Sequence, residues 1–371
     1  MTEPNFQTYY KLLINFSVFI KRKMRMYFII GLLLISHLGL SQQDGFVEIK
    51  TELESKERWK LLEKVLESKR IVALGESLHG VKEYNSTKLE LIKYLHEELG
   101  FNVLALESDV AKNYFGNFHK LEIADTLFLK ELFTPPWHTE EHLEIVKYIK
   151  SKPKLKIIGF DIETKKDVNE ISKELNVSID GTANQVKVFL EEYGKWKELN
   201  GMNRAASVSE RDSTMAEVLI WIISDLYPDE KIIVSAHNTH ISNVEIRGAC
   251  MGEILKDNYR DQYYSIGFFH SLGNPKHVLR KVIYKNEKSK LPLNSIQSKF
   301  LKTGKSKIFV DIKSQQSENN WLFEELENVW VVNRIRRTIF KMNLAESFDG
   351  IIWIKEVTHP KYIIPNKYLE K

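Results

Sequence analysis

The sequence has little cysteine and no surplus of charge outside its first residues. A single cysteine, Cys250, excludes an intrachain disulfide framework and any cysteine-based metal cluster. The net charge is +4, but residues 1–42 contain five basic residues and one acidic residue, so the rest of the chain is neutral. Nucleic acid is therefore not an expected partner, because phosphate binding needs concentrated positive charge. With 43% hydrophobic and 28% charged residues, the composition is that of a globular protein.

After residue 42 no apolar run is long enough to cross a bilayer. Before it, residues 21–25 (KRKMR) form a basic cluster, and residues 27–40 follow as a short apolar run that ends in small and polar residues. This order predicts a secretory signal peptide within residues 1–42, because a membrane span needs about 20 apolar residues. We expect an exported protein, periplasmic or secreted, without a stable membrane span after cleavage. The alternatives are an uncleaved membrane anchor and a translation start at Met24 or Met26.

The main part of the chain alternates short β-branched runs with amphipathic helical stretches. The predicted strands cover residues 70–74, 102–106, 156–160, 231–235, 262–268, 278–284, 307–312 and 350–354. The first four are nearly continuous apolar runs, as expected for strands buried on both faces. This alternation predicts an α/β fold, a three-layer α/β/α sandwich around a mainly parallel sheet.

Two longer stretches interrupt this alternation, at about residues 108–155 and 164–230. We expect them to form a helical cap lobe over the cleft, within one domain that covers residues 46–365. In the second stretch, Asp212 is expected to cap the start of a helix.

Acidic residues and histidines follow the first four strands. Glu76 and His79 follow the first strand, Glu107 the second, Asp161 the third, and His237 and His240 the fourth; of these, Asp161 is expected to be a structural carboxylate. Because ligands of α/β folds bind beyond the carboxyl ends of parallel strands, we expect these groups to converge in one cleft.

This set of residues suits proton-transfer chemistry. A neutral histidine can take a proton from water, and a carboxylate on its other nitrogen fixes the tautomer and stabilises the imidazolium. Glu76 and His79 have the spacing for such a pair, although Glu76 could instead cap a helix. The other histidines are expected to be surface groups: His96, His119, His142, His270, His277 and His359.

Three mechanisms remain open on these residues. The first is metal-free hydrolysis with His79 as the general base. The second uses a divalent metal, since the two histidine-containing pairs and Glu107 could supply ligands, although no HExxH motif is present. The third uses Ser77 as nucleophile and is least favoured, because the second glycine of a GxSxG elbow is missing. We expect metal to be dispensable and no cofactor to be required.

Several ordered motifs resemble the erythromycin esterase family. They are residues 71–80 (IVALGESLHG), 100–109 (GFNVLALESD), 137–140 (WHTE), 158–162 (IGFDI), 211–216 (RDSTMA) and 236–240 (AHNTH). The resemblance extends over about residues 50–360.

The resemblance implies hydrolysis of a carboxylic ester, with a macrolide lactone as the named substrate and antibiotic resistance as the role. Glu76 and His79 match the family's essential glutamate and histidine, Glu107 matches its second-motif carboxylate, and His237 matches its catalytic-site histidine. The residues predicted to bind substrate are His240, Asn238, Lys88, Trp137 and Arg211. The alternative from another class is a periplasmic binding protein that keeps the cleft but has no turnover.

Overall fold

The computed structural model describes residues 46–50, 52–162, 191–196, 208–274, 276–277, 282–283, 291–315, 318, 320–333 and 336–363. The predicted signal peptide and much of the second predicted insertion lie outside these residues. Among the described helices, none has the length and apolarity of a membrane span.

A large sheet runs through the fold in the strand order β1-β9-β12-β6-β2-β5-β3-β4. Its strands are β1 (Phe46–Glu48), β2 (Ile71–Leu74), β3 (Phe101–Asp109), β4 (Lys156–Asp161), β5 (Lys231–Ser235), β6 (Tyr263–Gly273), β9 (Lys307–Asp311) and β12 (Gly350–Val357). From β12 to β4 every neighbouring pair is parallel, and β9 is antiparallel to β12. The prediction of an α/β fold with a mainly parallel sheet is confirmed.

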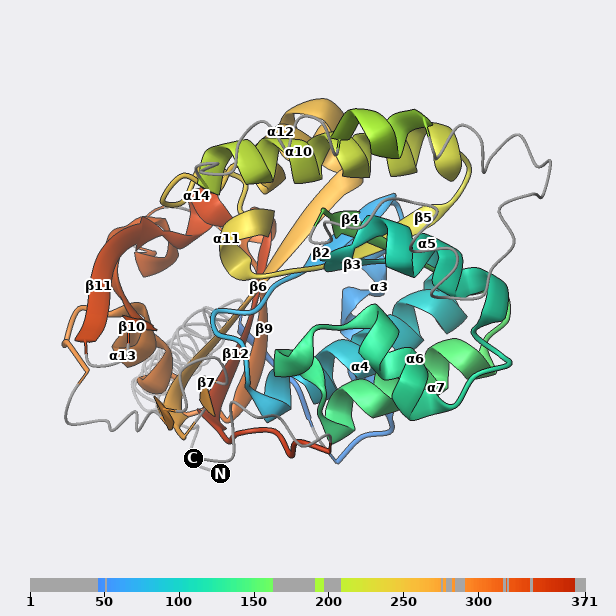
Figure 1. Cartoon of the computed structure of the whole chain (residues 1–371). Coiled ribbons are helices and arrows are strands. Elements are labelled where there is room, and N and C mark those ends of the chain that lie inside the picture. Colours follow the sequence, from blue (N-terminus) through green and yellow to red (C-terminus); the bar gives the residue numbers. More distant parts are fainter. Residues whose placement is uncertain are drawn as a thin grey trace, which may run out of the picture. The chain divides into compact units, whose positions relative to one another are not determined.

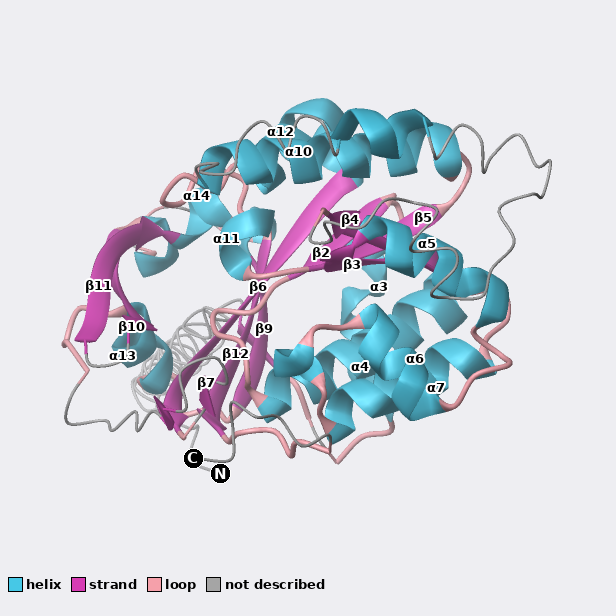
Figure 2. Cartoon of the chain, viewed as in Figure 1, coloured by secondary structure: helices cyan, strands magenta, loops and turns pink. Residues whose placement is uncertain are grey.

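Helices cover both faces of this sheet (Figure 1, Figure 2). On one face, Val72 and Leu74 of β2 belong to a continuous apolar cluster with α4 (Lys82–Leu99), α6 (Asp125–Leu132) and α7 (Glu140–Ser151). The other face carries α10 (Val208–Trp221) and α12 (Met251–Tyr259). Since successive side chains of a strand point to opposite faces, covering both faces requires the continuous apolar runs seen in the sequence.

Most of the helices lie between the strands, where the sequence predicts helical stretches. The remaining described α-helices are α2 (Ser55–Trp59), α3 (Glu63–Leu66), α5 (Val110–His119), α11 (Asn238–Ile241), α13 (Ile296–Leu301) and α14 (Leu344–Ser347). Helix α4 ends at Gly100, whose φ of 74° is the left-handed conformation that glycine adopts without strain. Between β3 and β4 the chain forms α5, α6 and α7, so the first predicted insertion is helical.

Two strand predictions differ from the structure. Within the predicted strand 278–284 the described residues are those of β8 (Val282–Ile283), which pairs antiparallel with β7 (Lys276–His277) in a separate small sheet. The antiparallel hairpin of β10 (Glu325–Asn333) and β11 (Arg336–Asn343) was not predicted. The hairpin is a two-stranded sheet separate from the large one, and its strands mix polar residues with the apolar run 329–332 (VWVV).

Three side-chain predictions were wrong. Helix α10 starts at Val208, so Asp212 lies inside the helix, fully buried, and does not cap it. His142 and His270, expected on the surface, are 5% and 7% exposed. His270 is buried because its Nδ1 hydrogen-bonds the Tyr84 hydroxyl at 2.7 Å, and His142 bonds Thr139. Polar neighbours in the sequence therefore did not mean an exposed position.

Strand β4 passes very close to an irregularity in β3. The register between the two strands shifts between Leu106 and Asp109, and a Cβ added to Gly159 would lie 2.3 Å from the Ser108 carbonyl oxygen. We therefore expect Gly159→Ala to lower the free energy of unfolding by about 1–3 kcal/mol, because backbone cannot yield as a side chain can. Urea denaturation measures the difference.

The matched control is Gly194→Ala, in an exposed helical turn where an added Cβ meets nothing within 4 Å. This variant should be neutral or more stable by about 0.5–1 kcal/mol, because alanine favours helix. Equal urea midpoints for Gly159→Ala and the parent protein would contradict the close approach of β3 and β4.

Candidate functional site

The strand order places the chemically interesting residues along one edge of the sheet. The strands β2, β5, β3 and β4 are consecutive neighbours, and their carboxyl ends lead to Glu76, His237, Glu107 and Asp161. Parallel strands end on the same side, so four separate segments of the chain meet there.

Glu76 and His79 form a short, directed pair. His79 Nδ1 lies 2.5 Å from Glu76 Oε1, and the other carboxylate oxygen accepts from Lys88 Nζ at 3.0 Å. Lys88 also donates to Ser235 Oγ at 3.3 Å. A carboxylate bound at Nδ1 holds the proton of neutral His79 on that nitrogen, so Nε2 carries the lone pair.

The ionised form of Glu76 and the protonated form of His79 stabilise each other. Burial opposes ionisation of Glu76, but the charge of Lys88 and the hydrogen bond from His79 lower the pKa of this carboxyl to about 2. Burial also opposes protonation of His79, yet the bond to Glu76 and its charge raise the pKa of the imidazole above 6.5. Glu76 is therefore ionised at neutral pH and makes His79 a stronger base.

A second buried cluster surrounds Glu107. Its Oε1 lies 3.4 Å from His240 Nε2 and 3.4 Å from a terminal nitrogen of Arg211. His240 Nδ1 contacts both oxygens of Asp212, at 2.8 and 3.0 Å, and Asp212 also accepts from the backbone N–H of Met251. The histidine is thus held between two carboxylates.

This arrangement fixes the charge of His240. Burial would lower the pKa of His240, but the charge of Glu107 and the hydrogen bond to Asp212 raise it to about 10. Glu107 is buried too, and the positive charge of His240 holds the pKa of this carboxyl well below its ordinary value. His240 is therefore a cation at neutral pH and cannot serve as a base there.

His237 has the opposite character. Burial, followed by the charges of His79 and His240, lowers the pKa of His237 to about 3, so its ring is neutral. The Thr239 backbone N–H donates to His237 Nδ1 at 3.3 Å, which leaves the ring proton on Nε2. The ring centroid lies 5.2 Å from that of His79, and the His237 backbone N–H donates to Glu107 Oε2 at 3.0 Å. His237 is thus a neutral N–H donor beside the base.

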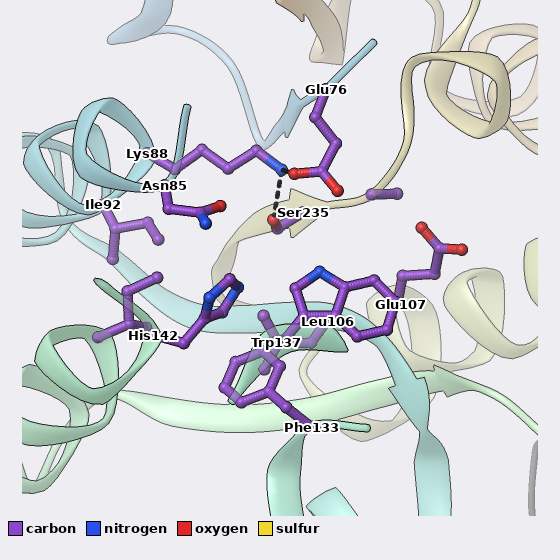
Figure 3. A pocket seen from close by; sticks show the side chains of 12 residues that line it. Glu76, Asn85, Lys88, Ile92, Leu106, Glu107, Phe133, Trp137, His142 and Ser235 are labelled. Atoms are coloured by element: carbon purple, nitrogen blue, oxygen red, sulfur yellow. Dashed lines mark hydrogen bonds and ion pairs between the residues drawn. The ribbon is translucent and has the colours of Figure 1, made fainter. Parts of the chain in front are cut away.

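A chamber lies next to the Glu76–His79 pair (Figure 3). Its polar lining comes from α4, α7 and the ends of the strands, and its apolar lining includes Trp137 and Phe133. The Trp137 and His79 rings meet edge to face, with centroids 5.0 Å apart. The geometry offers a base, a fixed carboxylate, an N–H donor and an adjoining pocket.

Comparison with known proteins finds relatives among the erythromycin esterases. The sequence model of the family described as Erythromycin esterase matches residues 177–357. The protein named erythromycin esterase type II of Escherichia coli is 22% identical, over 80% of this chain and 92% of its own length. The Bacillus subtilis protein YbfO, provisionally named a hydrolase, is 25% identical, over 82% of this chain and 87% of its own length.

A solved structure of a mutant of the erythromycin esterase EreC in its open conformation has the same fold. It superposes with a TM-score of 0.61 at 18% identity, covering 86% of this chain and all of that one. The resemblance of this chain to the erythromycin esterase family is thus confirmed. Its relatives include proteins that are named as hydrolases.

The structure brings most of the predicted site residues together. The four predicted catalytic residues, Glu76, His79, Glu107 and His237, are linked through the contacts described above. Among the predicted substrate-binding residues, Trp137 lies against His79, while Lys88 and His240 are engaged with carboxylates. Whether any of them contacts a substrate stays a prediction.

Arg211 and Asn238 have structural contacts. Arg211 binds Asp161 at 2.5 Å, and 38% of its side chain is exposed. The amide of Asn238 donates to the Phe268 carbonyl oxygen at 2.9 Å and accepts from its N–H at 3.1 Å. Asn238 is 4% exposed, and these two bonds hold the segment after β5 against β6.

Sequence reasoning missed Asp212, Asn85 and His142. For Asp212 a signal was available, because it lies three and seven residues before Met215 and Leu219, on the buried face of α10. A carboxylate on an apolar helix face needs a buried partner. Asn85 and His142 had no such signal, because their neighbourhood forms only when α4 and α7 pack side by side.

Metal ligation gains no support from the described residues. No group of three or more histidine, cysteine, aspartate or glutamate side chains in this part of the chain is placed to hold a metal ion. The expectation that metal is dispensable stays a prediction.

The His240–Asp212 contact gives a direct electrostatic prediction. We expect Asp212→Asn to lower the pKa of His240 from about 10, because a neutral amide no longer stabilises the imidazolium. Titration of the His240 ring by heteronuclear NMR measures this pKa in both proteins. An unchanged value in Asp212→Asn would show that Asp212 does not control the charge of His240.

Proposed function

We propose that this protein hydrolyses a carboxylic ester or lactone with a water molecule activated by His79. The observation that carries the proposal is the 2.5 Å contact between His79 Nδ1 and a buried carboxylate whose pKa is lowered to about 2. A pair of this kind can take a proton from water and stabilise the imidazolium that results. A protein that only bound a ligand would have no need of it.

The proposed reaction begins with attack of water on the carbonyl carbon of the ester. His79 Nε2 takes a proton from the water as the new C–O bond forms, and the carbonyl oxygen becomes an oxyanion. The Nε2–H of neutral His237 is the donor proposed for this oxyanion, because its ring lies beside that of His79. The protonated His79 then returns a proton to the departing alkoxide as the ester C–O bond breaks, giving an acid and an alcohol.

The remaining charges position these groups in the proposed mechanism. Lys88 keeps Glu76 ionised, and Glu76 orients His79 through Nδ1. Glu107 holds His237 through the backbone N–H and is itself fixed by the His240 cation. No step of the proposed reaction needs a cofactor or a metal.

For the substrate we propose a chemical class, an ester or lactone, and not one compound. A macrolide lactone is one candidate, because the E. coli relative is named an erythromycin esterase. The predicted signal peptide within residues 1–42 leads us to propose action outside the cytoplasm on a small molecule. Any ester with an accessible carbonyl carbon fits the proposed chemistry.

The first test replaces the two members of the pair. His79→Asn should reduce kcat for an activated aryl ester by about 10²–10⁴, because it removes the general base while keeping a similar shape. Glu76→Gln should reduce kcat by a comparable factor, and the double variant should be little worse than either single one, because the two groups act as a unit. Steady-state kinetics of purified, folded variants measures these losses.

The matched control is His359→Asn, an exposed histidine outside the site. It should leave kcat unchanged. Retention of more than about a tenth of wild-type kcat by folded His79→Asn would remove His79 from the role of base, and loss of activity on chelation would favour the metal-assisted alternative.

The second test uses the pH dependence. Since Glu76 raises the pKa of His79 above 6.5, the basic form is lost as pH falls through that raised value, and kcat/KM should fall with it. Glu76→Gln removes the negative charge, so the acid limb of its residual activity should move to lower pH. If the acid limb lay at the same pH in the wild type and in Glu76→Gln, the limb would report the titration of a group other than His79.

A further inference from the structure

We propose that the chamber beside the Glu76–His79 pair is a polar subsite that binds a neutral oxygen-bearing group of the ester, a hydroxyl or a carbonyl. This inference rests on the proposed function and goes further by naming a feature of the substrate. It stands on two buried side chains, Asn85 and His142, that take no part in the proposed reaction.

Asn85 is a buried residue whose side-chain amide makes no hydrogen bond within the described part of the chain. It lies on α4, one turn before Lys88, and is 4% exposed. Its side chain makes no hydrogen bond to any residue in the part of the chain that the structure describes, and it lines the chamber (Figure 3). The amide atoms of Asn85 are not among the fully enclosed side-chain atoms that lack a partner in the described residues, so they are open to a ligand group or water in the chamber.

His142 supplies a second group on the same wall. It lies on α7, is 5% exposed, and its Nδ1 is 3.0 Å from Thr139 Oγ1. Burial lowers the pKa of His142 to about 3, so the ring is neutral. If the Thr139 hydroxyl donates to Nδ1, the ring proton is on Nε2. Figure 3 shows the ring projecting into the chamber.

The rest of the lining defines the ligand chemistry. Asn85, His142 and the Lys88 ammonium together present N–H donors, which favours an oxygen acceptor. Trp137 and Phe133 supply apolar surface for the carbon atoms that carry this oxygen. The carboxylates of Glu76 and Glu107 also line the chamber, but Lys88 and His240 already balance their charges, so the lining favours a neutral oxygen group over a further anion.

The position of the chamber indicates which part of the substrate enters it. Glu76 lines the chamber and bonds His79, Lys88 lines it and bonds Glu76, and Trp137 lines it and packs edge to face on the His79 ring. A group bound there would therefore be close to the scissile carbonyl. An ester with a hydroxyl or carbonyl near its acyl carbon has the matching geometry.

The experiment compares two esters that differ by one hydroxyl, phenyl lactate and phenyl propanoate. The wild type should favour the lactate, and Asn85→Leu should lower the lactate-to-propanoate ratio of kcat/KM by about three- to tenfold, the loss expected for one hydrogen bond. His142→Phe keeps the packing against Phe133, removes the N–H and should lower the same ratio. Asn258→Leu, the same substitution at an exposed position of α12, should leave the ratio unchanged.

A binding measurement separates this inference from the proposed reaction. N-methyl lactamide and N-methyl propanamide carry the same pair of acyl groups but are far more resistant to hydrolysis, and ligand-observed NMR reports their affinities. Tighter binding of the lactamide to the wild type, reduced in Asn85→Leu, would support the subsite even if no ester were turned over. Equal affinities for the two amides, or an ester ratio unaffected by Asn85→Leu and His142→Phe, would overturn it.

Discussion

The candidate site depends on one buried carboxylate that stays ionised. Glu76 is 5% exposed, and a charge in such a place is unfavourable unless other groups compensate it. The compensation comes from Lys88 on one oxygen and His79 on the other, so both oxygens have fixed directions. The orientation and the basicity of His79 follow from this arrangement.

The same principle recurs around Glu107 with a different outcome. There the neighbouring histidine has a carboxylate on each ring nitrogen, and it becomes a permanent cation. His237, which hydrogen-bonds Thr239 at Nδ1, remains neutral instead. Three histidines within one site therefore have three different pKa values: carboxylate partners raise those of His79 and His240, while burial lowers that of His237.

The sequence was sufficient to predict the mainly parallel sheet and the residues that follow its strands. Continuous apolar runs identify strands that are covered on both faces, and the residues after β2, β3 and β5 must then meet if those strands are neighbours. The hairpin β10–β11 was not predicted, although β10 contains the apolar run 329–332 (VWVV). Asp212 was misassigned because an aspartate near a helix start is usually a cap, whereas here it bonds a histidine that is distant in sequence.

Asn85 and His142 show a different limit. Each is an ordinary polar residue on an amphipathic helix, and the pattern along one helix does not reveal which polar residue is enclosed. Enclosure depends on the packing of α4 against α7 and on the turn that carries Trp137. Which polar residue becomes buried is decided by contacts between segments that are distant in the sequence, and the pattern along one segment does not contain these contacts.

The charged groups of the site come from both helical layers. On one face of the sheet, Lys88 of α4 bonds Glu76. On the other face, Arg211 of α10 bonds Glu107 directly, and Asp212 of α10 bonds His240, which contacts Glu107 in turn. The charged contacts of the site therefore also hold the two helical layers together. Local opening of either layer would separate charges that are compensated only in the closed state, so catalytic competence and cohesion of the two layers should be lost together, ahead of global unfolding.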